Sequence, residues 1–101
     1  MGDRGNIIVK NGESKVYLYT HWGGSALKEI LMLALKRGKE RWNDGQYLAR
    51  IIFCEMVKGQ EDELTGFGIS SVMGDGGTDI VVDVVRQEVD RVSFSKFIGE
   101  L

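Results

Sequence analysis

The spacing of the hydrophobic residues changes twice along this chain of 101 residues. In 16–20, Val16, Leu18 and Thr20 alternate with two tyrosines, the period of two that is typical of a strand. In 25–37 the apolar residues recur every three or four positions, as on one face of a helix. The last third returns to short β-rich runs. Strands and helices are therefore segregated along the chain, which predicts an α+β fold rather than alternating β-α units.

Turn and capping residues divide the first half into a hairpin and two helices. Asn11-Gly12 predicts a tight turn between strands 6–10 and 16–20, because both residues tolerate the positive φ of such turns. The first helix is predicted to begin at Ser25 as its N-cap and to end at a left-handed Gly38. A second helix is predicted over 44–58, preceded by a capping box of Asn43 and Gln46.

Three β-rich runs follow, over 66–73, 79–87 and 91–97, with turns at 74–77 and 88–90. Short turns between consecutive strands predict an antiparallel meander. The expected architecture is one domain over 1–101, a two-layer sandwich of order β-β-α-α-β-β-β. Both helices would cover one face of a five-stranded, mainly antiparallel sheet.

Composition narrows the class of protein. The net charge is −2, so no general positive field attracts nucleic acid or an anionic membrane. The longest apolar run, 30–35, is far shorter than the roughly 20 residues of a membrane span. One cysteine and one histidine exclude an internal disulfide and the usual four-ligand zinc site. We expect a cytoplasmic protein without membrane partner, metal or cofactor, and a buried Cys54.

The candidate site lies where the second strand meets the first helix. Glycine N–H groups at Gly23 and Gly24, and the hydroxyl of Ser25, can converge on an anion at such a junction. His21 adds a titratable ring and Trp22 a stacking plane. These residues predict a site for an anionic small molecule or a nucleotide-like ligand. They also suit a purely structural turn, and no Walker pattern decides between the two.

Neighbouring residues extend this candidate site. The predicted hairpin places Arg4 near the end of its partner strand, where its guanidinium either binds a carboxylate or phosphate or is simply exposed. Tyr19 shares a sheet face with Tyr17, either under the helices or on a surface. Arg50 lies in an apolar helix and must reach either a partner or water. The complete predicted ligand-binding set is Arg4, Asn6, Tyr19, His21, Trp22, Gly23, Gly24, Ser25 and Arg50.

No reaction is indicated by the remaining polar residues. His21 could act as a general base, but no second catalytic group accompanies it, so the chain is read as a binding protein more than as an enzyme. Asp75, Asp79 and Asp83 lack the spacing of a calcium loop and are expected to be turn residues. Gly68 is expected to mark either a bulge or the close approach of a ligand or another chain.

Four sequence blocks occur together: Arg4-Gly5-Asn6-Ile7, 17–24, 47–53 and 65–70. As a set they resemble the signature blocks of a family of small, uncharacterised proteins of bacteria and their phages. The resemblance implies a prokaryotic or phage origin and no known activity. Small proteins in that setting often act by binding, for example by blocking a component of host defence.

The alternative function is therefore a protein–protein interaction module, such as a phage-encoded inhibitor of a host protein. It would use a sheet edge or the acidic loop 60–65. Few residues visibly protect the edge strands, which leaves a homodimer through an edge or an exposed sheet face open.

Overall fold

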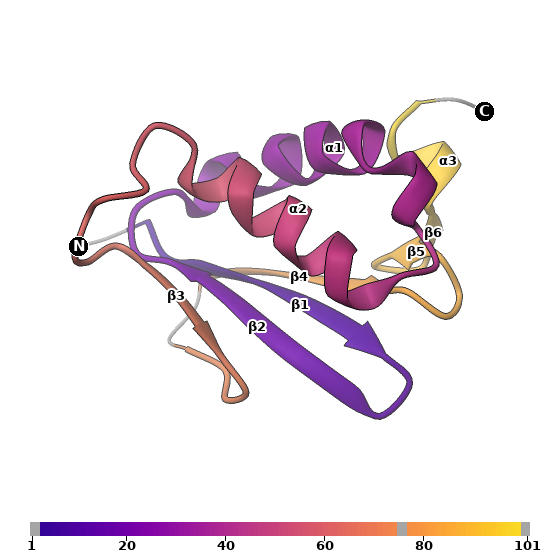
Figure 1. Cartoon of the computed structure of the whole chain (residues 1–101), viewed down its shortest axis with the longest axis horizontal. Coiled ribbons are helices and arrows are strands. Elements are labelled where there is room, and N and C mark those ends of the chain that lie inside the picture. The colour runs from indigo at the N-terminus through magenta and orange to yellow at the C-terminus, as the bar shows by residue number, and fades with distance from the viewer. Residues whose placement is uncertain (1–2, 75–76, 100–101) are drawn as a thin grey trace.

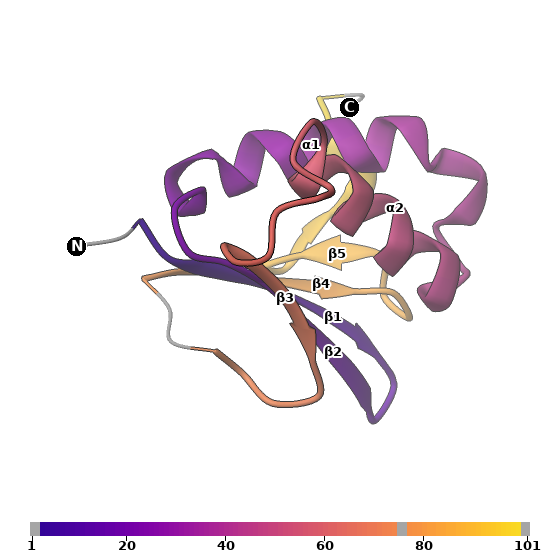
Figure 2. The same cartoon turned by 60° about the vertical axis from the view of Figure 1, so that its left-hand side comes forward.

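The computed structural model describes residues 3–74 and 77–99. Its helices are α1 (Leu27–Arg37), α2 (Gly45–Val57) and α3 (Phe94–Phe97), with 3₁₀ turns η1 (Gly24–Ala26) and η2 (Lys39–Arg41). Its strands are β1 (Gly5–Asn11), β2 (Ser14–Thr20), β3 (Phe67–Ser70), β4 (Thr78–Asp83), β5 (Glu88–Val89) and β6 (Val92–Ser93). α1 and α2 lie side by side on one face of the sheet (Figures 1 and 2). The predicted α+β class and the helical layer on one face are confirmed.

The sheet has six strands rather than the predicted five, in the order β3-β2-β1-β4-β5-β6. β1 and β2 form the predicted antiparallel hairpin, but β4 pairs with β1 in parallel, so the sheet is mixed. The meander predicted over 66–97 is wrong, because β3 pairs with β2 at one edge and the chain then crosses to β4 on the far side of β1. In this position Ile80 and Val82 lie beside Ile7 and Val9 in the core, which buries both strands.

The segment 91–97 is mostly not a strand. Asp90 and Arg91, with φ of 47° and 75°, form the tight turn between β5 and β6. β6 ends after two residues, because the Ser93 hydroxyl accepts a hydrogen bond from Lys96 N at 3.2 Å and caps α3. This cap turns the Phe94 ring into the core, where it is 1% exposed.

Three helix caps differ from the sequence prediction. α2 begins after Asp44, whose carboxylate accepts a hydrogen bond from Tyr47 N at 3.2 Å, so the predicted capping box at Asn43 and Gln46 is wrong. α1 begins after Ala26, because Ser25 lies in η1. Gly38 does end α1, with φ of −97° rather than a left-handed value.

The hydrophobic core fills the space between the two long helices and the sheet face beneath them. Leu31, Leu35, Leu48 and Ile52 contribute the helical side, each with no exposed surface. Residues 3–74 and 77–99 contain no helix long and apolar enough to cross a membrane.

Candidate functional site

The His21–Ser25 loop leaves the end of β2 beside the start of β3. His21 N donates a hydrogen bond to Gly66 O at 2.8 Å, and the His21 Nδ1 atom lies 3.1 Å from the Tyr19 hydroxyl. The Trp22 ring packs edge-on against the rings of His21 and Phe67, with centroids 5.4 and 6.5 Å away. Trp22 is nonetheless 48% exposed. The aromatic residues therefore reach the surface, as the sequence prediction of a stacking plane requires.

The N–H groups of Gly23, Gly24 and Ser25, which were predicted to bind an anion, already have partners within the protein. Gly24 N donates to Asp3 O at 2.7 Å, and Ser25 N donates to the Asp3 carboxylate at 2.9 Å. The Ser25 hydroxyl also donates to that carboxylate, and Gly23 N donates to the Thr20 hydroxyl at 3.0 Å. The Asp3 carboxylate thus lies where an anionic ligand was predicted. Anion binding at this loop stays a prediction, and a ligand would have to displace Asp3.

The acid dependence of stability tests this contact. Hydrogen bonds from the Ser25 hydroxyl, and then from Ser25 N, lower the pKa of Asp3 below its ordinary value of 3.8. Because the folded-state pKa is the lower one, the stabilisation is present above pH 3.8 and is lost as the pH falls through the folded-state value. We expect Asp3→Asn to lower the melting temperature at pH 7, and the difference from wild type to shrink by pH 2.5. Circular dichroism melts at both pH values check this; a constant difference would contradict it.

Arg4 and Asn6 lie beside the end of β2, where the hairpin prediction placed them. Asn6 is the partner of Tyr19, and Gly5 of Thr20, so the start of β1 adjoins the end of β2. Asn6 is fully buried, and its amide donates to Gly74 O at 3.1 Å and to the Asp79 carboxylate at 3.0 Å. These bonds attach the β3–β4 connection to the sheet. Arg4 is exposed, while its backbone oxygen accepts from Gly77 N and Thr78 N.

The two tyrosines of β2 face away from the helices. Leu18, between them, is 1% exposed in the core, whereas Tyr17 pairs with Ile8 and Tyr19 with Asn6 on the opposite face. The sequence left open whether the two tyrosines lie under the helices or on a surface. They lie on the surface opposite the helices. Gly74 packs so closely on the Tyr19 ring that a Cβ there would lie 2.8 Å from its nearest carbon. Tyr19 is thereby half-buried under the connection.

Arg50 and Cys54 lie on the outer side of α2. The helix buries Leu48, Ile52 and Met56, which share one stripe, and so turns Arg50 and Cys54 toward solvent. The prediction of a buried thiol is wrong, since Cys54 is exposed, with its Sγ atom 3.9 Å from Arg50 Nη1. Arg50 reaches water rather than the His21–Ser25 loop.

A cavity of about 220 Å³ lies beneath the indole of Trp22. Its walls are largely apolar, and its polar side chains are those of Thr20 and Gln60. The apolar wall consists chiefly of Trp22, Leu27, Ile30, Met56 and Phe67. This cavity suits an aliphatic or aromatic group better than a phosphate.

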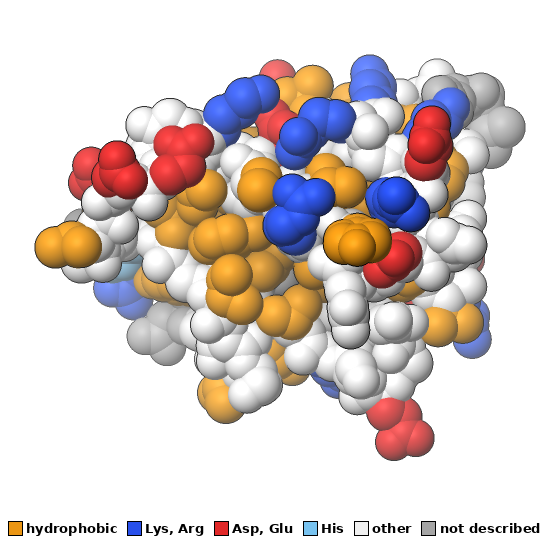
Figure 3. Space-filling model, viewed as in Figure 1, with side chains coloured by type: hydrophobic (Ala, Val, Ile, Leu, Met, Phe, Trp, Pro, Cys, Tyr) orange, Lys and Arg blue, Asp and Glu red, His pale blue; other side chains and the backbone are white. Residues whose placement is uncertain are grey.

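Exposed apolar side chains concentrate around β3. Of the ten large hydrophobic side chains that are exposed in the described chain, five surround this strand: Trp22, Leu64, Ile69, Val72 and Met73. We call these five residues the β3 surface. Figure 3 shows hydrophobic atoms gathered between α2 and β3, with acidic side chains beyond them at the loop that follows α2. The sequence predictions included Trp22 in the ligand site and Leu64 in the acidic loop 60–65. They did not join these residues to Ile69, Val72 and Met73, for which the uncharged run 66–73 was the signal.

The predictions for Gly68 and for three aspartates can be compared with the structure. Gly68 pairs regularly with Tyr19, so the predicted bulge is wrong. Nothing of the described chain lies within 4 Å of a Cβ placed there, and the close approach of a ligand or another chain stays a prediction. Asp79 and Asp83 lie in β4, so the expectation that they are turn residues is wrong, while Asp75 lies outside the described residues. Their carboxylates accept hydrogen bonds from the Asn6 amide and from Arg86 N. Within 3–74 and 77–99 no group of acidic, histidine or cysteine side chains is placed to hold a metal.

Comparison with known proteins supplies no relative from which a role for these surfaces can be taken. No family model, curated protein or solved structure matches the chain.

Proposed function

We propose that this protein is a protein–protein interaction module that binds an extended segment of a partner along the free edge of β3. Among the described strands, β3 is the terminal one and has a neighbour on one side alone. Its sequence, Phe67-Gly68-Ile69-Ser70, contains neither charge nor proline, the residues with which proteins usually protect an edge. Its unpaired backbone N–H and C=O groups are a template for an added strand. This unprotected edge, bordered by exposed apolar side chains, is the observation that carries the proposal.

Side chains beside the edge supply the binding energy that backbone pairing alone lacks. Ile69 is 60% exposed and lies on the helix side of the sheet, since its partner on β2 is the core residue Leu18. The Trp22 cavity opens beside Phe67, at the start of the same strand. A partner strand would place one apolar side chain over Ile69 and another in this cavity. A few such buried anchors usually account for most of the affinity of an interface.

The other edge of the sheet is a weaker candidate. β6 has two residues and continues directly into α3, so it offers little backbone to pair with. The longer β3 edge is therefore the better template among the described strands.

The blocks that carry the sequence resemblance support the same surface. Three of them, 17–24, 47–53 and 65–70, fall largely on β2, α2 and β3. β2 pairs with β3, and α2 packs on β2, so the three blocks are neighbours in space. A host-defence component as the partner stays a prediction from the resemblance.

Ile69→Lys tests the proposal. We expect it to weaken binding of extended peptides, selected from a displayed library against the wild-type protein, at least tenfold by fluorescence anisotropy. The lysine must be desolvated beneath the added strand, and a tenfold loss corresponds to about 1.4 kcal/mol. Bound peptide should also slow amide hydrogen exchange in β3, because the N–H groups on the free edge of β3 become hydrogen-bonded to the peptide.

Val85→Lys is the matched control, because Val85 is 68% exposed in the turn between β4 and β5, away from β3. Val85→Lys should keep the wild-type affinity for the peptides. His21→Ala should also keep it; if His21→Ala lost binding, the result would instead support the His21–Ser25 loop as the site. Selected peptides that bind both lysine variants equally would contradict the proposal. Sedimentation velocity separates the remaining alternative, in which the added strand comes from a second copy of the chain.

A further inference from the structure

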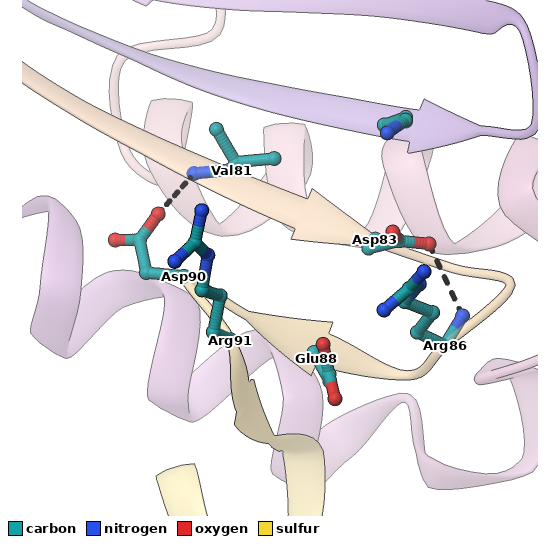
Figure 4. Close-up of a pocket in the computed structure, with 7 residues that line it drawn as sticks. Val81, Asp83, Arg86, Glu88, Asp90 and Arg91 are labelled. Atoms are coloured by element: carbon teal, nitrogen blue, oxygen red, sulfur yellow. Dashed lines mark hydrogen bonds between the residues drawn. The ribbon is translucent and has the colours of Figure 1, made fainter.

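A second cavity, of about 380 Å³, lies at the β4–β5–β6 end of the sheet (Figure 4). It opens on the face away from the helices, because Val81 and Lys10 lie on that face and their neighbours Ile80, Val82 and Val9 lie in the core. Three cationic side chains, of Lys10, Arg86 and Arg91, and three carboxylates, of Asp83, Glu88 and Asp90, line it. None of these residues belongs to the β3 surface.

The charges around this cavity are poorly matched within the protein. Asp83 accepts a hydrogen bond from Arg86 N at 3.1 Å, and Asp90 accepts one from Val81 N at 3.0 Å. Both carboxylates are therefore bonded to backbone (Figure 4). Among described residues, the side chains of Lys10, Arg86, Arg91 and Glu88 have neither hydrogen bond nor ion pair.

Two of the carboxylates also oppose each other. Asp83 on β4 has two direct cross-strand partners, Lys10 on β1 and Glu88 on β5, and Asp83 and Glu88 are both half-buried. Lys10 forms no ion pair with Asp83, so it leaves the Asp83–Glu88 pair without a bonded cation. Like charges at directly opposed positions destabilise a sheet. A cationic group placed between Asp83 and Glu88 would remove that cost.

The backbone at Arg91 supplies an independent observation. Tight turns with positive φ at both central positions favour Asn-Gly, whereas this one is Asp90-Arg91. An arginine at φ of 75° is strained, and glycine would adopt this conformation without cost. Strain of this kind is retained where a side chain is needed. The turn aims the Arg91 guanidinium at the cavity (Figure 4).

We propose that this cavity binds a small zwitterion that carries one carboxylate and one ammonium group, as a free α-amino acid does. The guanidinium groups of Arg86 and Arg91 bind the carboxylate in charge-assisted hydrogen bonds. Asp83 and Glu88 receive the ammonium group. The proposal is independent of protein binding at β3, since it uses other residues at the opposite end of the strand order.

An NMR titration tests the site with glycine, L-alanine, L-leucine, L-glutamate and L-lysine, following the amide signals of Val81, Arg86 and Asp90. Acetate and methylammonium, each with one of the two charges, are the matched probes. We expect saturable shifts at millimolar concentration with at least one amino acid, and at least tenfold weaker binding of both single-charge probes. Absence of saturable shifts with all five amino acids, or equal binding of acetate, would overturn the proposal.

Arg91→Gly separates binding from folding. The substitution should lower the affinity for the amino acid at least tenfold. It should nevertheless raise the melting temperature of the free protein by about 4 °C, because the backbone strain at residue 91 is removed. Gln87→Gly is the matched control: Gln87 has φ of 54° in the same region but does not line the cavity. It should raise the melting temperature and keep the affinity. Unchanged affinity in Arg91→Gly would refute the role of the guanidinium.

Discussion

Replacing Phe94 with alanine is expected to lower the free energy of unfolding by about 3–5 kcal/mol, the usual cost of removing a buried aromatic ring. Phe94 is 1% exposed at the start of α3, and its ring lies edge-on to Trp42 with centroids 5.1 Å apart. The indole of Trp42 in turn donates to Leu35 O at 2.9 Å, at the end of α1. Removal of the Phe94 ring would leave a cavity where α3 meets this region. Urea denaturation, followed by circular dichroism, measures the loss.

The matched control is Val92→Ala two residues earlier. Val92 is 38% exposed in β6, so the substitution should cost about 1 kcal/mol or less. A continuous strand over 91–97 would place the side chains of Val92 and Phe94 on the same face of the sheet. The two alanine variants would then lose similar amounts of free energy of unfolding. Similar losses for the two variants would therefore contradict α3 and restore the strand that the sequence predicted.

Gly24→Ala is expected to cost about 2–4 kcal/mol, from overpacking and from lost hydrogen bonds. A Cβ at Gly24 would lie 2.5 Å from Arg4 O and 2.8 Å from Asp3 O. These are backbone atoms, so the segment before β1 must move and the bonds from Gly24 N and Ser25 N to Asp3 must weaken. The same urea denaturation measures this loss.

Gly23→Ala is the control within the same Gly-Gly pair. At Gly23 φ is −113°, and the nearest contact of a Cβ is a side-chain oxygen, Thr20 Oγ1, at 3.0 Å. A small shift of that hydroxyl relieves the contact, so we expect a loss of about 1 kcal/mol or less. Equal losses at the two glycines would show that the close packing of η1 on Asp3 and Arg4 is not what requires Gly24.

Local patterns predicted the elements that local energetics controls. The alternation in 16–20, the turn residue Gly12 and the helical spacing after Ser25 gave the hairpin and α1, because each depends on neighbours within a few residues. The hairpin in turn placed Arg4 and Asn6 beside the end of β2 correctly. The strand predicted over 91–97 was wrong, because its alternating apolar residues suit a short strand and a capped helical turn equally well. The Ser93 hydroxyl caps α3, and this cap favours the helical turn.

The sequence correctly placed the His21–Ser25 loop between a strand and a helix. It did not predict the hydrogen-bond partners of that loop. Gly23, Gly24 and Ser25 have the donors of an anion site, and nothing near them in sequence shows that Asp3, 22 residues from Ser25, would bond to them. The sequence left the direction of Arg50 open and wrongly predicted a buried Cys54, because an almost wholly apolar helix has no clear outer face until it is packed on a sheet.

Residue order was sufficient for the α+β class, the hairpin, both long helices and the position of the aromatic loop, since each rests on contacts made within one or two elements. Strand order was not encoded locally. A buried apolar strand gains similar energy beside any partner, so the parallel pairing of β4 with β1 follows from how the whole chain closes its core. That pairing leaves β3 at a free edge and gathers the charges of the β4–β5–β6 cavity, and both proposed binding surfaces result from it.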